Sequence, residues 1–341
     1  MGPATVSRDR FDYTEAVAES WKSQMLLNLV KIRYGDAPVF LDVGQVVAGY
    51  SMQRTLSASA NAFNTQGFSP GTTIGALGLG AESHFNDSPT ITYTPLAGEN
   101  FARQMMMPIP PSAILNVIQA GFPVNAVFRL AVQAVNGVDN RRVRLDYVRP
   151  ASPEFYILVR DLARLQDAGD IGARVDRADK DEKLTLVFRP KLSAVEESAV
   201  LDIAKILGLD PGAREFRVVY GSVAANDKEI ALLTRSMVEV LTDLSSVIAV
   251  PEVHVTERRV QPRPVSDPGP GAPVPPLIRI ASSVDRPSDA FVAVPYRGYW
   301  FFIDDRDVAS KHLLSSIMFL FTFVQTGTKD AAPILTIPTT R

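Results

Sequence analysis

Residues 50–85 carry the pattern that most constrains the fold, an alternation of side chains with a period of two. From Met52 to Ala62 the even positions are apolar except for Arg54, and the odd positions are all polar. A period of two is that of a strand and not of a helix. The glycines and proline of residues 67–71 favour a turn between two arms of 14 residues. We therefore predict a long β-hairpin, which cannot bury itself and is completed by something outside the monomer.

The two faces of this hairpin differ in polarity, and we predict a different role for each. We expect the polar row to line a wet lumen if the subunits form a ring; it comprises Gln53, Thr55, Ser57, Ser59, Asn61, Glu82 and His84. We expect the remaining residues to contact other subunits or a membrane; they are Tyr50, Met52, Arg54, Leu56, Phe63, Phe68, Leu77, Leu79 and Phe85.

A ring of subunits could combine such hairpins into a shared β-barrel without free edges. The 14-residue arms exceed the ~9–11 residues of a tilted membrane crossing. Tyr50 and Phe85 at the base, with Phe63 and Phe68 at the tip, stand where interfacial aromatic girdles occur. Against insertion, Arg54 lies on the apolar face, which is also rich in alanine. We favour the alternative, an arm that packs in water on a neighbouring subunit or on its own domain.

Composition excludes several classes of function. With 341 residues, of which 46% are hydrophobic and 21% charged, the chain can bury a sizeable core and form two or three compact units. A net charge of -2 provides no basic field for nucleic acid, which we do not expect as a partner. The chain has no cysteine, which excludes disulfides, thiolate metal sites and thiol nucleophiles. The longest apolar run, residues 313–324, is too short for a membrane-spanning helix of ~20 residues.

The order of the predicted elements indicates an α+β fold with an N-terminal helix, a long hairpin arm and mixed α+β core layers. Apolar spacing predicts helices at 12–33, 112–120, 124–135, 153–167, 192–207, 227–246 and 308–324. We divide the chain into an N-terminal helix, a hairpin arm with an edge strand, an α+β core, a proline-rich linker and a C-terminal α+β segment that packs on the core. These parts are residues 1–38, 39–98, 99–260, 261–276 and 277–341.

No constellation in the sequence predicts chemistry. The histidines His84, His254 and His312 lack the spacing of metal ligands. Asp304, Asp305 and Asp307 could hold a divalent cation, but we expect Asp307 to cap a helix that begins at Val308. Neither a G-x-S-x-G elbow nor a phosphate-binding loop occurs. We predict no catalytic residue, no metal and no cofactor.

Three segments resemble an uncharacterised group of Gram-negative envelope proteins, many of which are inferred to be outer-membrane lipoproteins. They are SWKSQMLLNLVKIRYGDAPVFLDV, PTITYTPLAGENF and YRGYWFFIDDRDVASK. The resemblance implies export and attachment to the periplasmic side of the outer membrane, and it implies no catalytic residue. The opening Met1-Gly2-Pro3 fits an expression remnant whose native leader was removed, and it fits a natural cytosolic start equally well.

We therefore expect a non-enzymatic envelope assembly protein that forms a homo-oligomer through residues 50–85, as a ring or pore component of an export or surface complex. Other envelope proteins and the outer membrane are further expected partners. One alternative is a soluble periplasmic ligand-binding module with the aromatic residues of 296–302 as its wall. The other is a hydrolase that uses His254 or the carboxylates of 304–307 in a cleft assembled by the fold.

Overall fold

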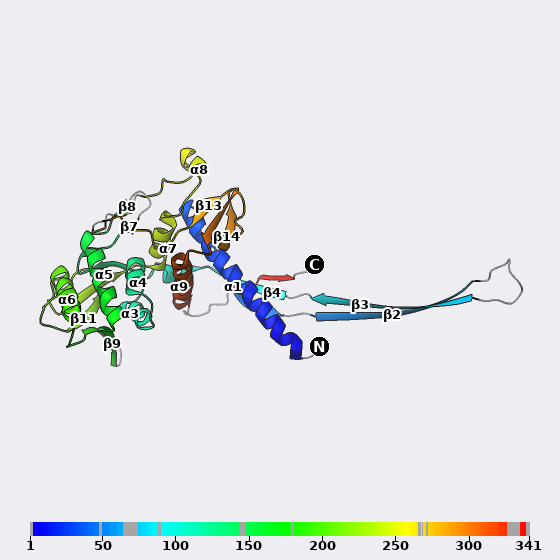
Figure 1. The fold of residues 1–341 in the computed structure, drawn as a ribbon, viewed down its shortest axis with the longest axis horizontal. Coiled ribbons are helices and arrows are strands. Elements are labelled where there is room, and N and C mark those ends of the chain that lie inside the picture. The colour runs from blue at the N-terminus through cyan, green and yellow to red at the C-terminus, as the bar shows by residue number, and fades with distance from the viewer. Residues whose placement is uncertain are drawn as a thin grey trace, which may run out of the picture. The chain divides into compact units, whose positions relative to one another are not determined.

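The computed structural model describes residues 3–47, 50–63, 74–87, 90–143, 148–178, 181–264, 267, 269–270, 272–325 and 335–338. The chain divides into two compact units (Figure 1). Unit 1 comprises residues 1–39 and 97–329, and unit 2 comprises residues 40–96 and 330–341.

A six-stranded mixed sheet forms one half of unit 1. Its order is β6 (Val138–Asp139), β5 (Val132–Val135), β12 (Glu229–Thr234), β11 (Glu215–Tyr220), β10 (Asp181–Phe188) and β9 (Ile171–Ala178). The pair β11–β12 is parallel and the other neighbours are antiparallel. Helices together with a mixed sheet in one unit confirm the predicted α+β class.

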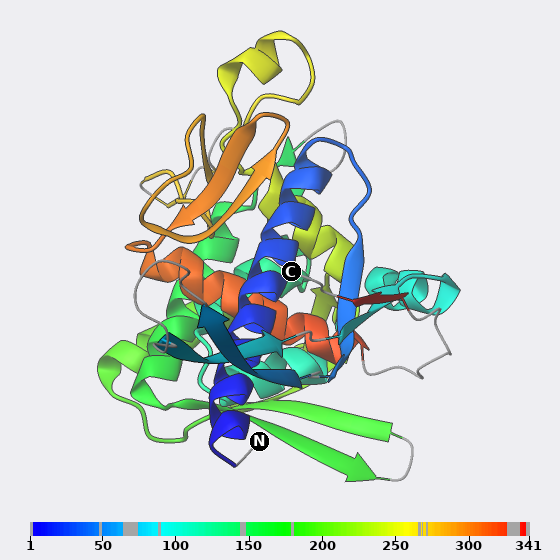
Figure 2. The ribbon, with the colours of Figure 1, turned by 90° about the vertical axis from the view of Figure 1, so that its right-hand side faces the viewer.

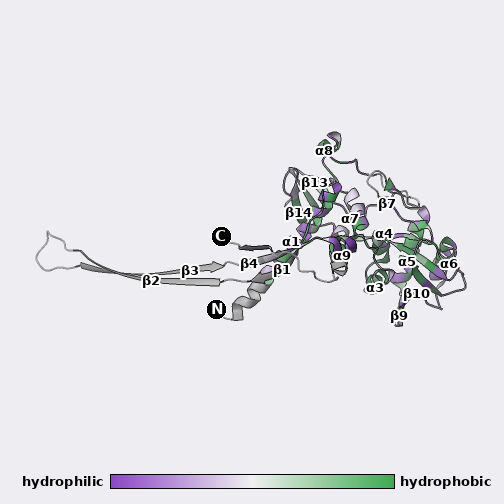
Figure 3. Ribbon diagram, turned by 180° about the vertical axis from the view of Figure 1, so that it is seen from behind, coloured by the Kyte–Doolittle hydropathy of each residue, from purple (hydrophilic) through white to green (hydrophobic). Residues whose placement is uncertain are grey.

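Four helices lie against this sheet or on one another. They are α3 (Pro111–Gln119), α4 (Val124–Ala131), α5 (Pro153–Ala168) and α6 (Ala194–Leu207). Helices α3 and α5 contact β9, α4 contacts β5, and α6 packs on α5. The buried residues of α5 recur every three or four positions, at Phe155, Leu158, Leu162 and Leu165. Hydrophilic and hydrophobic residues accordingly alternate along α5 and α6 (Figure 3).

The other half of unit 1 surrounds the long helix α1 (Pro3–Arg33), which crosses α9 (Val308–Gln325; Figure 2). Helix α1 also contacts α7 (Met237–Ser246) and a three-stranded sheet. The order of this sheet is β13 (Ala281–Ser283), β15 (Tyr299–Asp304) and β14 (Ala290–Tyr296), and α1 contacts its strands β14 and β15. Arg297 and Gly298 join β14 to β15 with positive φ angles of 48° and 82°, as a two-residue type I′ turn requires. The smaller elements are α2 (Glu99–Met106), α8 (Glu252–Thr256) and the pair β7 (Arg142–Val143) and β8 (Val148–Arg149).

Helix α1 ends where the sequence predicts and begins nine residues earlier than predicted, at residue 3 instead of 12. Gly35, with φ of 76°, turns the chain out of the helix. The buried amide of Asn28 then pairs with both backbone groups of Val39, accepting from its N–H at 2.9 Å and donating to its carbonyl at 2.8 Å. The start was predicted too late because an apolar stripe is not needed to extend a helix that has already formed.

The described residues of unit 2 form two separate sheets. Strand β4 (Thr90–Leu96) is the centre of a three-stranded sheet, between β1 (Phe40–Val47) and β16 (Leu335–Pro338). The prediction of an edge strand here is wrong, because β16 comes from the far end of the chain and pairs with residues 90–93 of β4. Pro95 lies outside the pairing of β4 with β16, so its missing N–H removes no hydrogen bond between these two strands. The second sheet is the pair β2 (Tyr50–Phe63) and β3 (Ile74–Asp87).

Two predicted helices are wrong in part. The helix predicted at 124–135 stops at Ala131, and residues 132–135 form β5, which Asn136 and Gly137 connect to β6 with positive φ angles. The helix predicted at 227–246 is strand β12 followed by α7. Helix α7 begins after Ser236, whose hydroxyl caps the backbone N–H of Glu239 while the Glu239 carboxylate accepts the N–H of Ser236.

The described residues of 261–276 pack within unit 1. The carbonyls of Gln261 and Pro275 accept hydrogen bonds from Arg33 and Arg129, at 2.6 and 2.7 Å. Asp267 is 4% exposed and accepts a hydrogen bond of 2.6 Å from the Tyr156 hydroxyl. The proline-rich segment is therefore an excursion that the surrounding unit holds by polar contacts.

Candidate functional site

The hairpin β2–β3 has a continuous register. Each residue of β2, from Tyr50 to Phe63, has a partner in β3, and the pairing runs without a shift from Tyr50 with Asp87 to Phe63 with Ile74. At ~3.4 Å per residue, each 14-residue strand is about 48 Å long. A regular antiparallel ribbon of this length agrees with the alternation in the sequence (Figure 1).

The register brings the predicted polar positions together on one face. Gln53 pairs with His84, Thr55 with Glu82, and Ser57 and Ser59 with glycines 80 and 78. Because directly paired residues share a face, these positions and Asn61 belong to a single polar row.

The remaining predicted contact positions share the other face, with two exceptions. Met52 pairs with Phe85, and Leu56, Leu77 and Leu79 all pair with alanines. Tyr50 is one diagonal step from Phe85, and Arg54 pairs with Ser83. The two exceptions are Phe63 and Phe68. Phe63 pairs with Ile74 and belongs to the same face as the polar row, and Phe68 lies outside the described residues.

Both outer edges of this ribbon carry unpaired backbone groups among the described residues, where β2 and β3 pair only with each other. In an antiparallel pair, alternate residues direct N–H and C=O groups away from the partner strand. Each edge of 14 residues thus offers roughly seven such residues to another strand. An isolated two-stranded hairpin is at best marginally stable in water, so this ribbon has the geometry of a strand-pairing site.

Membrane-crossing helices are not found in the part of the chain that the structure describes. None of its helices is both long enough and apolar enough to span a bilayer.

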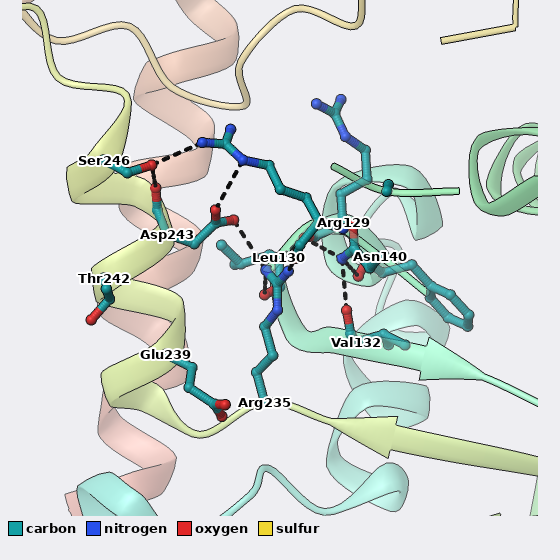
Figure 4. A network of polar contacts seen from close by, with 12 residues as sticks. Arg129, Leu130, Val132, Asn140, Arg235, Glu239, Thr242, Asp243 and Ser246 are labelled. Carbon is teal, nitrogen blue, oxygen red and sulfur yellow. Dashed lines mark hydrogen bonds and ion pairs between the residues drawn. The ribbon is translucent and has the colours of Figure 1, made fainter. Parts of the chain in front are cut away.

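Unit 1 contains a buried charge network that no sequence pattern indicated (Figure 4). The guanidinium of Arg235 donates to the carbonyls of Arg129 and Leu130, both at 3.1 Å, and to the Asp243 carboxylate at 3.0 Å. Asn140 donates to the carbonyls of Arg129 and Val132 at 3.0 and 2.7 Å. These two side chains satisfy the carbonyl end of α4, which explains why the helix can stop at Ala131 and continue directly as a strand.

The same network reaches the proline-rich segment through Arg141. The Arg141 Nε atom lies 3.6 Å from Asp243 Oδ1 and 3.9 Å from Asp267 Oδ1. Burial and the hydrogen bond to Asp267 raise the pKa of Tyr156, so its hydroxyl remains a donor. An adjoining cavity of about 40 Å³ has room for roughly two or three water molecules. These paired opposite charges suit a structural lock, by which we mean a network that holds the proline-rich segment and α7 against the end of α4, better than a reaction centre.

His254, one basis of the hydrolase alternative, packs among aromatic rings. Its Nδ1 atom lies 2.7 Å from the Tyr34 hydroxyl, and its ring meets Tyr299 edge-on with centroids 5.1 Å apart. Burial lowers the pKa of His254 below its ordinary 6.5; Arg259 adds to this effect and Glu257 opposes it. A buried neutral imidazole between two tyrosines is typical of a packed core.

The aromatic strand considered as the wall of a ligand site faces the same cluster. Phe301 is fully buried and meets Tyr34 edge-on at 6.0 Å, and the Tyr296 ring lies 5.3 Å from Tyr34. The Tyr296 hydroxyl donates to Asp36, which also pairs with Arg297 at 3.0 Å. These residues connect the end of α1 to the β14–β15 turn.

The carboxylates of 304–307 act as the capping prediction requires. Asp307 accepts the backbone N–H and the hydroxyl of Ser310, at 3.1 and 2.8 Å, in the first turn of α9. Asp304 accepts the N–H of Arg306 at 2.8 Å, and Asp305 pairs with Lys311 at 2.7 Å. Among the described residues, no three histidine, aspartate or glutamate side chains are grouped to hold a metal ion.

A large apolar groove separates α4 from α9, and no sequence motif indicated it. Its volume is about 760 Å³. The end of α3, the turn at 121–123, α4, residues 275–279 and one side of α9 form its walls. Asp307 and His312 both line it, but the two Asp307 oxygens are engaged by Ser310.

No protein-family model, no curated protein and no solved structure matches this chain.

Proposed function

We propose that this chain is a non-enzymatic cell-envelope protein that assembles into a homo-oligomer through the β2–β3 hairpin. In this proposal the hairpins of neighbouring copies pair edge to edge, and the closed ring of hairpins serves an export or surface complex as a ring or pore component. The periplasmic side of the outer membrane is its proposed location, in line with the resemblance of three segments to envelope proteins.

One observation carries the proposal. Two strands of 14 residues pair in continuous register, and in the described part of the chain neither outer edge has a partner strand. Copies of the same hairpin are suitable partners because every copy offers the same spacing of donors and acceptors over the same length. Pairing all copies in a ring would leave no edge exposed.

The division between the faces supports a ring in particular. A closed ring has an inner and an outer surface, and the register sorts most polar and most apolar positions of the hairpin onto opposite faces. The polar row from Gln53 to Asn61 fits a wet inner surface. The opposite row, which includes Met52 and Leu56, fits contact with a membrane or with surrounding protein.

The mass of the particle tests the proposal. Light scattering of the purified protein, in buffer and in detergent, is expected to give a multiple of the monomer mass in at least one of them. Removal of residues 51–84 is expected to reduce that mass to the monomer. A wild-type protein that is monomeric in both solutions, or an unchanged assembly after the deletion, would contradict the proposal.

Two neighbouring lysine substitutions test the assignment of the faces. Ala58 belongs to the apolar row and Ser57 to the polar row, so Ala58→Lys and Ser57→Lys add the same charge at nearly the same position. A lysine on a face that contacts protein or lipid has to be desolvated, whereas a lysine on a wet face does not. We expect Ala58→Lys to reduce the mass of the assembly and Ser57→Lys to leave it unchanged in light scattering. Equal effects of both variants would refute the assignment.

A further inference from the structure

The apolar groove of unit 1 has the size and the lining of a small-molecule site. Ligand pockets commonly measure ~300–1,000 Å³ and are mostly apolar, with a few polar groups. The groove, at about 760 Å³, lies within this range. Its floor consists of side chains that are at most 7% exposed; they are Val117, Val127, Leu130, Leu313 and Leu320.

The groove is long and runs beside α9. Ala309 and Leu320 both line it, and at ~1.5 Å per residue they are about 17 Å apart along the helix axis. The rings of Phe122 and Phe319 stack at 6.1 Å near the C-terminal end of this stretch. The shape suits an extended hydrocarbon chain better than a compact ring system.

The groove has further polar groups at its other end. Three more polar residues in the lining, Arg129, Ser315 and Ser316, already donate to the carbonyls of Pro275, Lys311 and His312. The Arg279 N–H donates to the Ser310 hydroxyl at 2.9 Å, which fixes Arg279 beside the first turn of α9. The side chains of Arg279 and His312 are exposed, and among the described residues the Arg279 guanidinium has no ion-pair partner. Asp307 is the acidic side chain in the lining, and its two oxygens already bind Ser310.

We infer that this groove binds a single-chain anionic amphiphile of the fatty-acid class. Its carboxylate lies at Arg279, and its acyl chain runs along α9 toward Phe319. The observation behind this assignment is the polarity of the groove itself, which has an available cation at one end and a buried apolar floor along the rest. The inference concerns residues of unit 1 only and does not depend on the hairpin.

Calorimetric titration of the full chain with saturated carboxylates, below their micelle concentrations, tests the inference. Affinity is expected to rise about fourfold for each methylene between octanoate and dodecanoate, because each buried methylene contributes ~0.8 kcal/mol. Dodecyltrimethylammonium, which has the same chain and the opposite charge, is expected to bind at least about fivefold more weakly than dodecanoate.

Variants separate the two ends of the groove. Arg279→Glu is expected to weaken dodecanoate binding about fivefold or more. Arg217→Glu is the matched control, because Arg217 is an exposed residue of β11 outside the groove, and it is expected to leave binding unchanged. Ser316→Trp places an indole in the acyl channel and is expected to weaken binding more than tenfold. Ala126→Trp does the same from α4, so a loss of folding in one variant leaves the other informative.

Several results would overturn the inference. They are the absence of dodecanoate binding, an affinity independent of chain length, equal binding of the cationic analogue, and full binding by both folded tryptophan variants. If Ser316→Trp changes the mass of the assembly and the wild type binds no dodecanoate, the groove is a protein contact and the assignment to an amphiphile is wrong.

Discussion

The buried carboxylate of Asp243 gives the sharpest test of the core of unit 1. Replacement of Asp243 by asparagine preserves the size of the side chain and removes its charge. Arg235, which binds Asp243 at 3.0 Å, then loses its carboxylate partner. Arg141, which lies 3.6 Å from Asp243, loses one of its two carboxylates and keeps Asp267 at 3.9 Å. The Arg235 side chain is 4% exposed, so water cannot replace the lost partner.

The expected loss follows from these distances. A charge-assisted hydrogen bond contributes ~1.5–3 kcal/mol, which covers the contact with Arg235. A pair of unit charges 3.6 Å apart interacts by about 4.6 kcal/mol at an effective dielectric constant of about 20. The carboxylate no longer has to be desolvated, which returns several kcal/mol. We therefore expect Asp243→Asn to lower the free energy of unfolding by about 3–5 kcal/mol, as for other buried pairs that lose one partner.

Urea unfolding followed by tryptophan fluorescence measures this change. The chain has two tryptophans, Trp21 in α1 and Trp300 in β15, and both report on unit 1. The control is Asp289→Asn, which removes an equally short pair, Arg306 with Asp289 at 2.8 Å, whose side chains are 78% and 62% exposed. We expect this variant to lose less than about 1 kcal/mol. If Asp243→Asn loses no more than the control, the network is not a structural lock.

Two further changes test other parts of unit 1. The pKa of His254 is lower in the folded state than its ordinary 6.5. The neutral imidazole therefore contributes to the free energy of unfolding in full above pH 6.5, and this contribution decreases as the pH falls below that value. The melting temperature should fall between pH 7 and pH 5, and His254→Gln should flatten this fall; an identical pH profile in the variant would contradict the assignment. Asp307→Ala removes the cap of α9 and should lower the free energy of unfolding by about 1 kcal/mol in the urea assay. An unchanged free energy of unfolding in Asp307→Ala would contradict the capping role.

Local patterns explain which parts of the fold could be predicted. The period of two over residues 50–85 and the apolar stripe of 153–167 each belong to one element, and both elements are present in the structure. The predicted helices at 124–135 and 227–246 are wrong in part, because their apolar spacing continues across residues that favour a turn or a helix start. Asn136-Gly137 is a strong hairpin signal, and Ser236 with Glu239 forms a capping box that marks the start of α7.

The candidate sites differ in how far apart in the sequence their residues are. The hairpin could be predicted because its partners are close in sequence. Arg141 and Asp267 come from segments more than a hundred residues apart, and α4 and α9 are farther apart still. A single sequence contains no signal for which arginine meets which aspartate, or for which two helices leave a groove between them. Tertiary packing decides both, and it also places β16 beside β4.

The hairpin and the groove belong to different units, and this separation makes their tests independent. The hairpin lies in unit 2 and the groove in unit 1. Removal of residues 51–84 should therefore abolish assembly and leave the affinity for dodecanoate within about twofold, whereas Ser316→Trp should do the reverse. Light scattering and calorimetry on the same two variants check both halves. If either variant changes both properties, assembly and amphiphile binding are coupled, and the reasoning that assigns them to separate parts of the chain is wrong.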